Sequence, residues 1–135
     1  MHTPVAQKSK LYPSYWSPKD CASQSNALFV FGDNDMCTGL GGQAIIRHCV
    51  NSHGIPTKKK PSHHPNAFYI DKEFEENISK INIAIKSICK KSADYDIIYF
   101  PKNGFGTGLA ALTQYAPKTL ATLNQKIYDT FGISF

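Results

Sequence analysis

The sequence has few of the features that mark membrane, secreted or metal-binding proteins. No apolar run approaches the roughly 20 residues needed to span a bilayer, so we expect no transmembrane segment. The N-terminal region has no apolar stretch typical of a secretory signal. Its cysteines lie far apart without a CxxC pair, which fits neither a zinc site nor a disulfide scaffold. We therefore expect reduced thiols and a cytoplasmic protein.

Arginine is nearly absent as well. Of the 15 basic residues only Arg47 is an arginine, and the lysines behind the formal net charge of +5 are spread along the chain. Proteins that contact base edges or clamp phosphates in a bidentate way depend on arginine. The charge therefore favours a small anionic ligand over sequence-specific DNA binding.

The overall composition is that of an ordinary globular protein. With 135 residues, of which 41% are hydrophobic, the chain suffices for one domain with its own core. Residues 1–26 are rich in proline, serine and lysine and predict an irregular N-terminal extension, followed by a domain over residues 27–135. Tyr12, Tyr15 and Trp16 in this extension either pack on the domain or offer a stacking surface for a ligand base.

From residue 27 onward the sequence predicts alternating strands and helices. The expected strands are 27–31, 67–70 and 96–100, and the expected helices follow Gly42 and cover about 74–91 and 117–131. A lysine-rich loop is expected from Ile55 to Pro65, and Gly132 is expected to cap the last helix. Crossovers of this length imply parallel strands and a layered α/β fold.

Two glycine-rich loops after predicted strands carry the candidate ligand-binding residues. They contain Gly32, Asp33, Asn34, Gly39, Leu40, Gly41 and Gly42 in the first loop and Asn103, Gly104, Phe105, Gly106, Thr107 and Gly108 in the second. Glycine lets backbone N–H groups approach an anion closely, and ligands of parallel sheets bind at the carboxyl ends of the strands. Two such loops at one sheet edge are expected to hold two linked phosphates between them.

Other phosphate, hydrolase and metal motifs fit poorly. The segment Gly39–Ala44 satisfies GxGxx[GA], but seven residues separate it from the strand and no acidic residue follows about 20 residues later. Neither loop ends in GK[ST], and no serine occupies a nucleophile elbow. The pair His63–His64 lies in a polar loop. We therefore expect no metal and no redox cofactor.

Three charged residues near the loops are candidates for chemistry. Asp33 and Asp35, at the end of the first strand, either contact a base or ribose, act as acid or base, or simply cap the turn. Lys58 leads a run of three lysines, and the apolar Ile55 and the rigid Pro56 before it favour a fixed position over a solvated one.

The segments Phe29–Asn34, Gly39–Ala44, Ile55–Lys58 and Asn103–Leu109, in this order, resemble a compact macro domain. The pattern is similar to the branch of the terminal ADP-ribose protein glycohydrolase and to macro-like proteins of bacteriophages. The resemblance covers residues 27–133 and implies a three-layer α/β/α domain with a mixed, largely parallel sheet. It also implies a ligand, which is ADP-ribose or a related NAD-derived nucleotide, free or attached to a protein.

The resemblance further implies roles for individual residues. Asp33 would face the adenine or a ribose, the first loop would contact the distal ribose and a phosphate, and the second would wrap the diphosphate. Lys58 stands where the branch has the lysine that attacks the anomeric carbon of the ribose. Ala110 stands where the branch has its catalytic acid, so Asp35 would have to supply that group.

Three classes of function follow from these observations. The first is binding of an ADP-ribose-type nucleotide with hydrolysis of an ADP-ribosyl bond, in which Lys58 and Asp35 are the catalytic residues. The second is a non-catalytic reader or sequestering protein for such a nucleotide, acting in the host-cell cytoplasm if a phage encodes it. The third, disfavoured by the shortage of arginine, is a nucleic-acid binder. Retention of Lys58 favours the enzyme, and Ala110 favours the binding protein.

Overall fold

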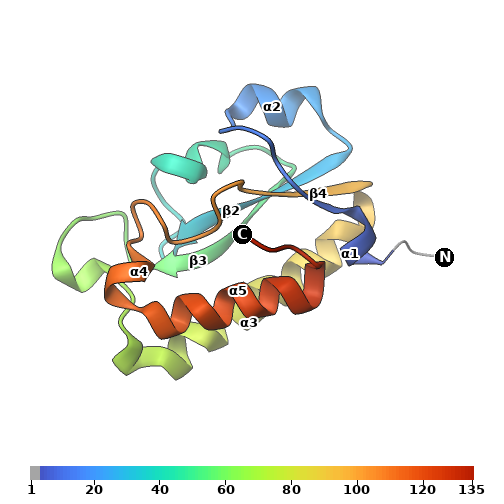
Figure 1. Cartoon of the computed structure of the whole chain (residues 1–135). Helices are drawn as coiled ribbons and strands as arrows, with labels where there is room; N and C mark the ends of the chain where they lie inside the picture. The colour runs from blue at the N-terminus through green and yellow to red at the C-terminus, as the bar shows by residue number, and fades with distance from the viewer. Residues whose placement is uncertain (1–3) are drawn as a thin grey trace.

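The computed structural model describes residues 4–135, so residues 1–3 of the predicted extension lie outside the described part (Figure 1). The helices are α1 (Val5–Lys8), α2 (Pro18–Ser23), α3 (Phe74–Lys91), α4 (Leu112–Tyr115) and α5 (Pro117–Phe131). The strands are β1 (Ser9–Leu11), β2 (Ala27–Asn34), β3 (Ser52–Lys58) and β4 (Ile97–Phe100). Short 3₁₀ helices are η1 (Gly42–Ile46), η2 (Pro65–Ala67), η3 (Asp71–Glu73) and η4 (Ser92–Asp94). The expected α/β fold class is confirmed.

The four strands form one sheet in the order β1-β4-β2-β3, and every pair of neighbours is parallel. The sheet is therefore all-parallel rather than mixed. Within residues 4–135 the only antiparallel contact outside these strands is a single bridge between Lys58 and Phe68. The expected strand at 67–70 is reduced to this bridge, because Phe68 and Tyr69 are buried without pairing along a strand.

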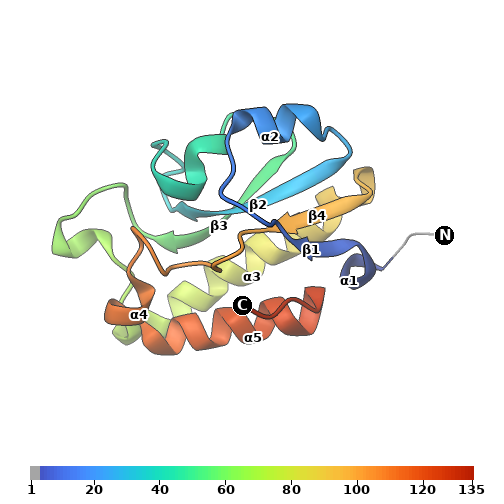
Figure 2. The ribbon, with the colours of Figure 1, turned by 45° about the horizontal axis from the view of Figure 1, so that its top comes forward.

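Both faces of the sheet are covered, which gives three layers (Figures 1 and 2). One face contributes Leu28, Val30, Ile98 and Phe100 to a core completed by α3 and α5. The other contributes Ala27, Phe29 and Phe31 to a core completed by Tyr12, Trp16, Cys21, Ala44 and Ile46. Burial on both faces explains why β2 begins as a continuous apolar run instead of an alternating one.

The two long helices lie where their periodicity predicts them. In α3 the side chains of Ile81, Ile85 and Ile88 are buried in one stripe, as expected from steps of three and four residues. Helix α5 ends at Gly132, which has a left-handed backbone with φ +69°. No helix in the described part of the chain is long and apolar enough to cross a membrane.

The expected extension is only partly irregular, because residues 5–11 and 18–23 are regular and residues 12–17 between them are not. The regular parts contain α1, β1 and α2, and β1 adds an edge strand to the sheet by pairing with β4. Tyr12 and Trp16 are buried in the core, whereas Tyr15 is exposed. A strand of three residues is too short to show a hydrophobic period, so only its pairing with β4 defines it.

The chain between the first two central strands also differs from expectation. The helix expected after Gly42 is the short 3₁₀ helix η1, and β3 extends over residues 55–58, the start of the segment expected to be a loop. Pro56 lowers the strand propensity of this segment, but β3 is an edge strand and an edge strand tolerates proline. Long-range pairing with β2 therefore overrides the local signal.

The path of the chain creates a crevice at the carboxyl edge of the sheet. Strands β2 and β4 are neighbours, but the chain leaves β2 toward η1 on one face and leaves β4 toward α4 and α5 on the other (Figure 2). In parallel sheets, ligands bind where adjacent connections diverge in this way. The two glycine-rich loops follow these two strands and therefore form the walls of the crevice.

Candidate functional site

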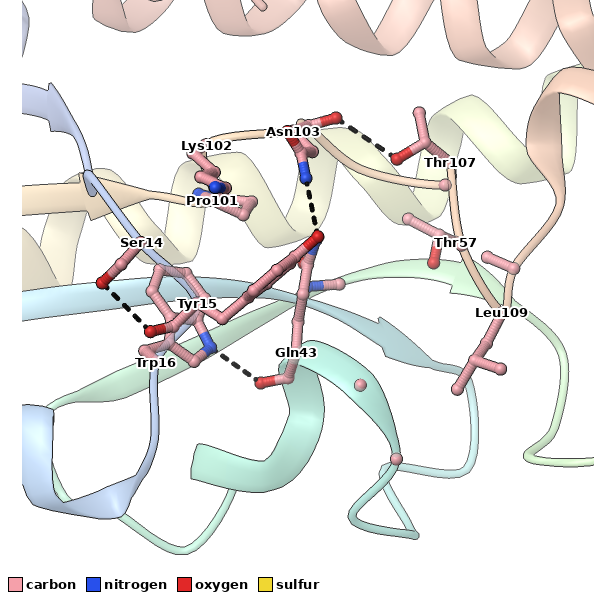
Figure 3. A pocket seen from close by; sticks show the side chains of 16 residues that line it. Ser14, Tyr15, Trp16, Gln43, Thr57, Pro101, Lys102, Asn103, Thr107 and Leu109 are labelled. Atoms are coloured by element: carbon pink, nitrogen blue, oxygen red, sulfur yellow. Dashed lines mark hydrogen bonds between the residues drawn. The ribbon is translucent and has the colours of Figure 1, made fainter.

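A cavity of about 490 Å³ lies in this crevice (Figure 3). Its size falls within the range of roughly 300–1,000 Å³ found for small-molecule sites. It is lined by Ser14, Tyr15, Trp16, Gly32, Gly41, Gly42, Gln43, Thr57, Pro101, Lys102, Asn103, Gly106, Thr107, Gly108, Leu109 and Ala110. Three parts of the chain thus meet here, which are the N-terminal arm, the first loop with the end of β3, and the second loop.

Thr57 reaches the cavity through an irregularity in the sheet. The pairing of β2 with β3 shifts between Asp33 and Asn34, which pair with Pro56 and Lys58 and leave Thr57 as the extra residue. Bulges of this kind bend a strand and redirect a side chain. The Thr57 hydroxyl donates a hydrogen bond to the Asp33 carbonyl at 3.1 Å, which fixes this side chain at the cavity wall.

Gln43 connects the two loops. Its Oε1 accepts a hydrogen bond from the Gly32 N–H at 2.7 Å, and its Nε2 donates to the Gly104 carbonyl at 2.8 Å. Its own carbonyl accepts from the Trp16 indole N–H at 3.1 Å, so the arm is attached to the same residue. This one residue therefore sets the spacing of the three parts that form the cavity.

The second loop owes its shape to glycines and to a buried aromatic anchor. Gly104 and Gly106 have positive φ values of +79° and +74°, which residues with a side chain rarely adopt. Between them Phe105 is fully buried against Phe100 and Phe135. The Gly106 carbonyl accepts from the Leu112 N–H at 2.8 Å, which joins the loop to α4.

Backbone N–H groups of both loops are available to a ligand. Within residues 4–135, the N–H groups of Gly106, Thr107, Gly108, Leu109 and Ala110 donate no hydrogen bond. The same holds, in the described part of the chain, for Gly41, Gly42 and Gln43. Runs of such donors form concave anion sites, and they lie on facing walls of one cavity. This arrangement suits an anion with more than one phosphate.

The charge of the cavity wall agrees with an anionic ligand. Lys102 is the one charged residue among its lining, and within residues 4–135 it forms no ion pair. No aspartate or glutamate of the described part contributes to the wall. A phosphate would therefore meet donors and a cation without a competing carboxylate.

Asp33 does not line the cavity and is engaged elsewhere. Its carboxylate forms an ion pair of 2.6 Å with Arg47, and the two side chains are only 8% and 10% exposed. Arg47 also donates to the carbonyls of Thr38 and Gly39, at 3.0 and 2.9 Å. The pair therefore fixes the first loop, and Asp33 is not free to contact a base.

Asp33→Asn is expected to lower the free energy of unfolding by about 2–3 kcal/mol, somewhat less than the loss of a fully buried pair, because Arg47 keeps its carbonyl partners. The matched control is Glu73→Gln, which removes the Lys59–Glu73 pair, also 2.6 Å long but with both side chains 31% exposed. Exposed pairs contribute less than about 1 kcal/mol. Urea unfolding of both variants measures the difference, and equal losses would contradict a buried role for Asp33.

Asn34 and Asp35 do not line the cavity either. Asn34 holds the turn after β2, since its Oδ1 accepts from the Met36 N–H at 3.0 Å and its Nδ2 donates to the Thr38 carbonyl at 2.8 Å. The Asp35 carboxylate accepts from the Tyr69 hydroxyl at 2.5 Å and pairs with Lys80 of α3 at 2.7 Å. Burial, followed by this hydrogen bond, raises the pKa of Tyr69.

Lys58 is buried beside the second loop. Its Nζ donates to the Leu109 carbonyl at 3.3 Å and lies 4.8 Å from the centre of the Phe68 ring. Burial lowers the pKa of Lys58, as expected for an ammonium group without a carboxylate partner. Burial and this hydrogen bond confirm the expected fixed position of Lys58, but the side chain does not line the cavity.

The candidates from the sequence thus fall into two groups. Gly32, Gly41, Gly42, Asn103, Gly106, Thr107 and Gly108 meet at the cavity. Asp33, Asn34, Asp35, Gly39, Leu40, Lys58, Gly104 and Phe105 lie outside its lining. Sequence reasoning missed Gln43, Thr57 and Lys102 as site residues, although Gln43 and Lys102 lie within the two loops and their place there was a usable signal.

The fold and the site define an α/β protein with a cavity at the carboxyl edge of a parallel sheet, lined by two glycine-rich loops. The chain belongs to a family described as "Family of unknown function (DUF7831)", whose model matches residues 11–126. No curated protein and no solved structure matches the chain. Within residues 4–135, no group of three or more histidine, cysteine, aspartate or glutamate side chains is placed to hold a metal ion.

Proposed function

We propose that this protein binds ADP-ribose or a related NAD-derived nucleotide in the cavity between the two glycine-rich loops. The observation that carries the proposal is the pair of facing loops whose backbone N–H groups lack acceptors within residues 4–135. Donors from both loops can contact two linked phosphates from two sides, whereas one loop alone would contact them from a single side. The resemblance to macro domains supplies the identity of the nucleotide.

Binding without hydrolysis is the form of this function that the geometry favours. Asp35 is engaged by Tyr69 and Lys80, and Lys58 by the Leu109 carbonyl, so neither side chain lines the cavity. Ala110, at the place of the expected acid, does line it and has no group that transfers a proton. A reader or a sequestering protein for an ADP-ribose-type nucleotide therefore fits better than a glycohydrolase.

Calorimetric titration with ADP-ribose, with AMP as the control, tests the proposal. We expect a dissociation constant in the micromolar range, which corresponds to a binding free energy of about −8 kcal/mol. AMP is expected to bind more weakly, because it cannot engage both loops. The ligand is expected to be intact after hours of incubation. Release of free ADP-ribose from an ADP-ribosylated peptide would establish hydrolysis instead.

The salt dependence of the same titration separates a nucleotide pocket from a nucleic-acid surface. Contacts to many phosphates release many counterions, and affinity then falls steeply with salt. We expect the logarithm of the affinity to fall only slightly with the logarithm of the salt concentration, as for contacts to about two phosphates. Absence of heat with ADP-ribose, together with steep binding to an oligonucleotide, would reject the proposed function.

A further inference from the structure

The N-terminal arm places one aromatic ring at the cavity without burying it. Tyr12 and Trp16 are 7% and 8% exposed, whereas Tyr15 between them is 80% exposed and lines the cavity. The backbone next to Tyr15 is anchored by the hydrogen bond from the Trp16 indole to Gln43. A large aromatic side chain is thus held in position but left open to solvent beside the phosphate loops.

The second loop holds this ring from one side. Asn103 Nδ2 donates to the Tyr15 hydroxyl at 3.3 Å, and Lys102 Nζ lies 4.8 Å from the ring centre (Figure 3). Figure 3 shows Tyr15 and Leu109 at opposite ends of the cavity, with Asn103 and Thr107 on one wall and Gln43 on the other. A ligand with its phosphates between the loops therefore has one end directed toward Tyr15.

The chemistry at this end suits a nucleobase. Bases stack on exposed aromatic rings, and a nearby cation strengthens the contact. Within residues 4–135 the Oδ1 of Asn103 accepts no hydrogen bond, so this amide retains an acceptor. Asparagine amides pair with the amino group and N7 of adenine. Asp33, the alternative partner for adenine, is engaged by Arg47.

We infer that Tyr15 and Asn103 form the nucleobase subsite of this pocket and select an adenine-type purine that carries an exocyclic amino group. This inference rests on the proposed function, because it assumes that the diphosphate lies between the two loops. The N-terminal arm then contributes to the binding site through Tyr15 as well as to the core through Tyr12 and Trp16.

The test compares a ligand with a base and a ligand without one. The chain contains a single tryptophan, Trp16, which lines the cavity, so its fluorescence reports binding of both ADP-ribose and inorganic pyrophosphate. In Tyr15→Ala we expect ADP-ribose affinity to fall roughly 5- to 150-fold, the range for loss of one stacking contact, while pyrophosphate affinity stays within about twofold. Tyr15→Phe is expected to retain most of the ADP-ribose affinity.

Tyr128→Ala is the matched control, because Tyr128 is also exposed and lies on α5. Unchanged ADP-ribose binding in Tyr15→Ala would overturn the subsite, as would an equal loss for both ligands, which would indicate that Tyr15 only shapes the loop. If the unaltered protein binds neither ligand, the proposed function fails and the subsite fails with it.

The hypoxanthine analogue of ADP-ribose tests the role of Asn103 separately. This analogue replaces the amino group by a carbonyl, which removes the donor for Asn103 Oδ1. We expect affinity to fall roughly 5-fold or more relative to ADP-ribose in the unaltered protein. In Asn103→Leu the two nucleotides are expected to bind alike. Equal affinity of both nucleotides in the unaltered protein would overturn the selection of an amino-bearing base.

Discussion

Gly106→Ala is expected to lower the free energy of unfolding by about 2–5 kcal/mol. It is also expected to abolish the rise in melting temperature that ADP-ribose causes in the unaltered protein. A Cβ at this position would overlap Leu112 Cδ1 and lie 2.6 Å from Leu112 Cγ. Leu112 is fully buried, so it cannot move aside cheaply. A side chain at φ +74° adds about 1–2 kcal/mol of backbone strain, and overpacking adds about 1–3 kcal/mol.

Gly108→Ala is the matched control, two residues further along the same loop. Nothing lies within 4 Å of a Cβ at Gly108, and its φ is not positive. Its stability is expected to stay within about 0.5 kcal/mol of the unaltered protein. Thermal unfolding with and without ADP-ribose measures both effects, with a fall of roughly 10 °C expected for Gly106→Ala. Equal melting temperatures for the two variants would contradict the described contact between the loop and α4.

The sequence predicts those parts of the fold that local periodicity determines. The stripe through Ile81, Ile85 and Ile88 identifies α3, and the glycine that follows Phe131 marks the end of α5. The two glycine-rich loops can also be placed at one edge, because strands joined by helical crossovers are parallel and their carboxyl ends lie together. These inferences need no knowledge of contacts between distant residues.

The remainder of the site depends on contacts between distant residues. Thr57 lines the cavity because β3 pairs with β2 through a bulge, and the local sequence with Pro56 predicts a loop. Tyr15 reaches the pocket through an arm in which β1 has just three residues. Neither position has a periodic signal, and both are fixed by tertiary pairing that a single sequence does not contain.

The acidic residues illustrate a second limit on predicting the site from the sequence. Asp33 and Asp35 follow a buried strand and are reasonable candidates for contact with a ligand, but their partners Arg47 and Lys80 lie 14 and 45 residues further along the chain. Ion pairing turns both carboxylates into structural groups. Charged side chains at the carboxyl edge of a parallel sheet can either contact a ligand or support a loop. The two roles are distinguished only by the partners of each side chain, which the local sequence does not show.

The support of the loops is best tested at Gln43, where Gln43→Glu is expected to weaken ADP-ribose binding about 100-fold. The carboxylate of the variant still accepts the Gly32 N–H, but it no longer donates to the Gly104 carbonyl. It also places a negative charge on the cavity wall. Like charges about 5 Å apart repel by about 3 kcal/mol at an effective dielectric constant near 20, which corresponds to the expected loss.

Gln43→Leu separates the charge from the lost hydrogen bonds. It leaves the Gly32 N–H and the Gly104 carbonyl without this partner and is expected to destabilise the protein by about 1–3 kcal/mol. Its loss of ADP-ribose affinity is nevertheless expected to be smaller than that of Gln43→Glu, because it adds no charge. Gln7→Glu, at an exposed position on α1, controls for the change in net charge. If Gln43→Glu binds ADP-ribose as tightly as Gln43→Leu, the phosphates of the ligand do not lie between the two loops. If Gln43→Glu alone binds ADP-ribose more weakly and its affinity depends on salt, the phosphates lie beside this side chain.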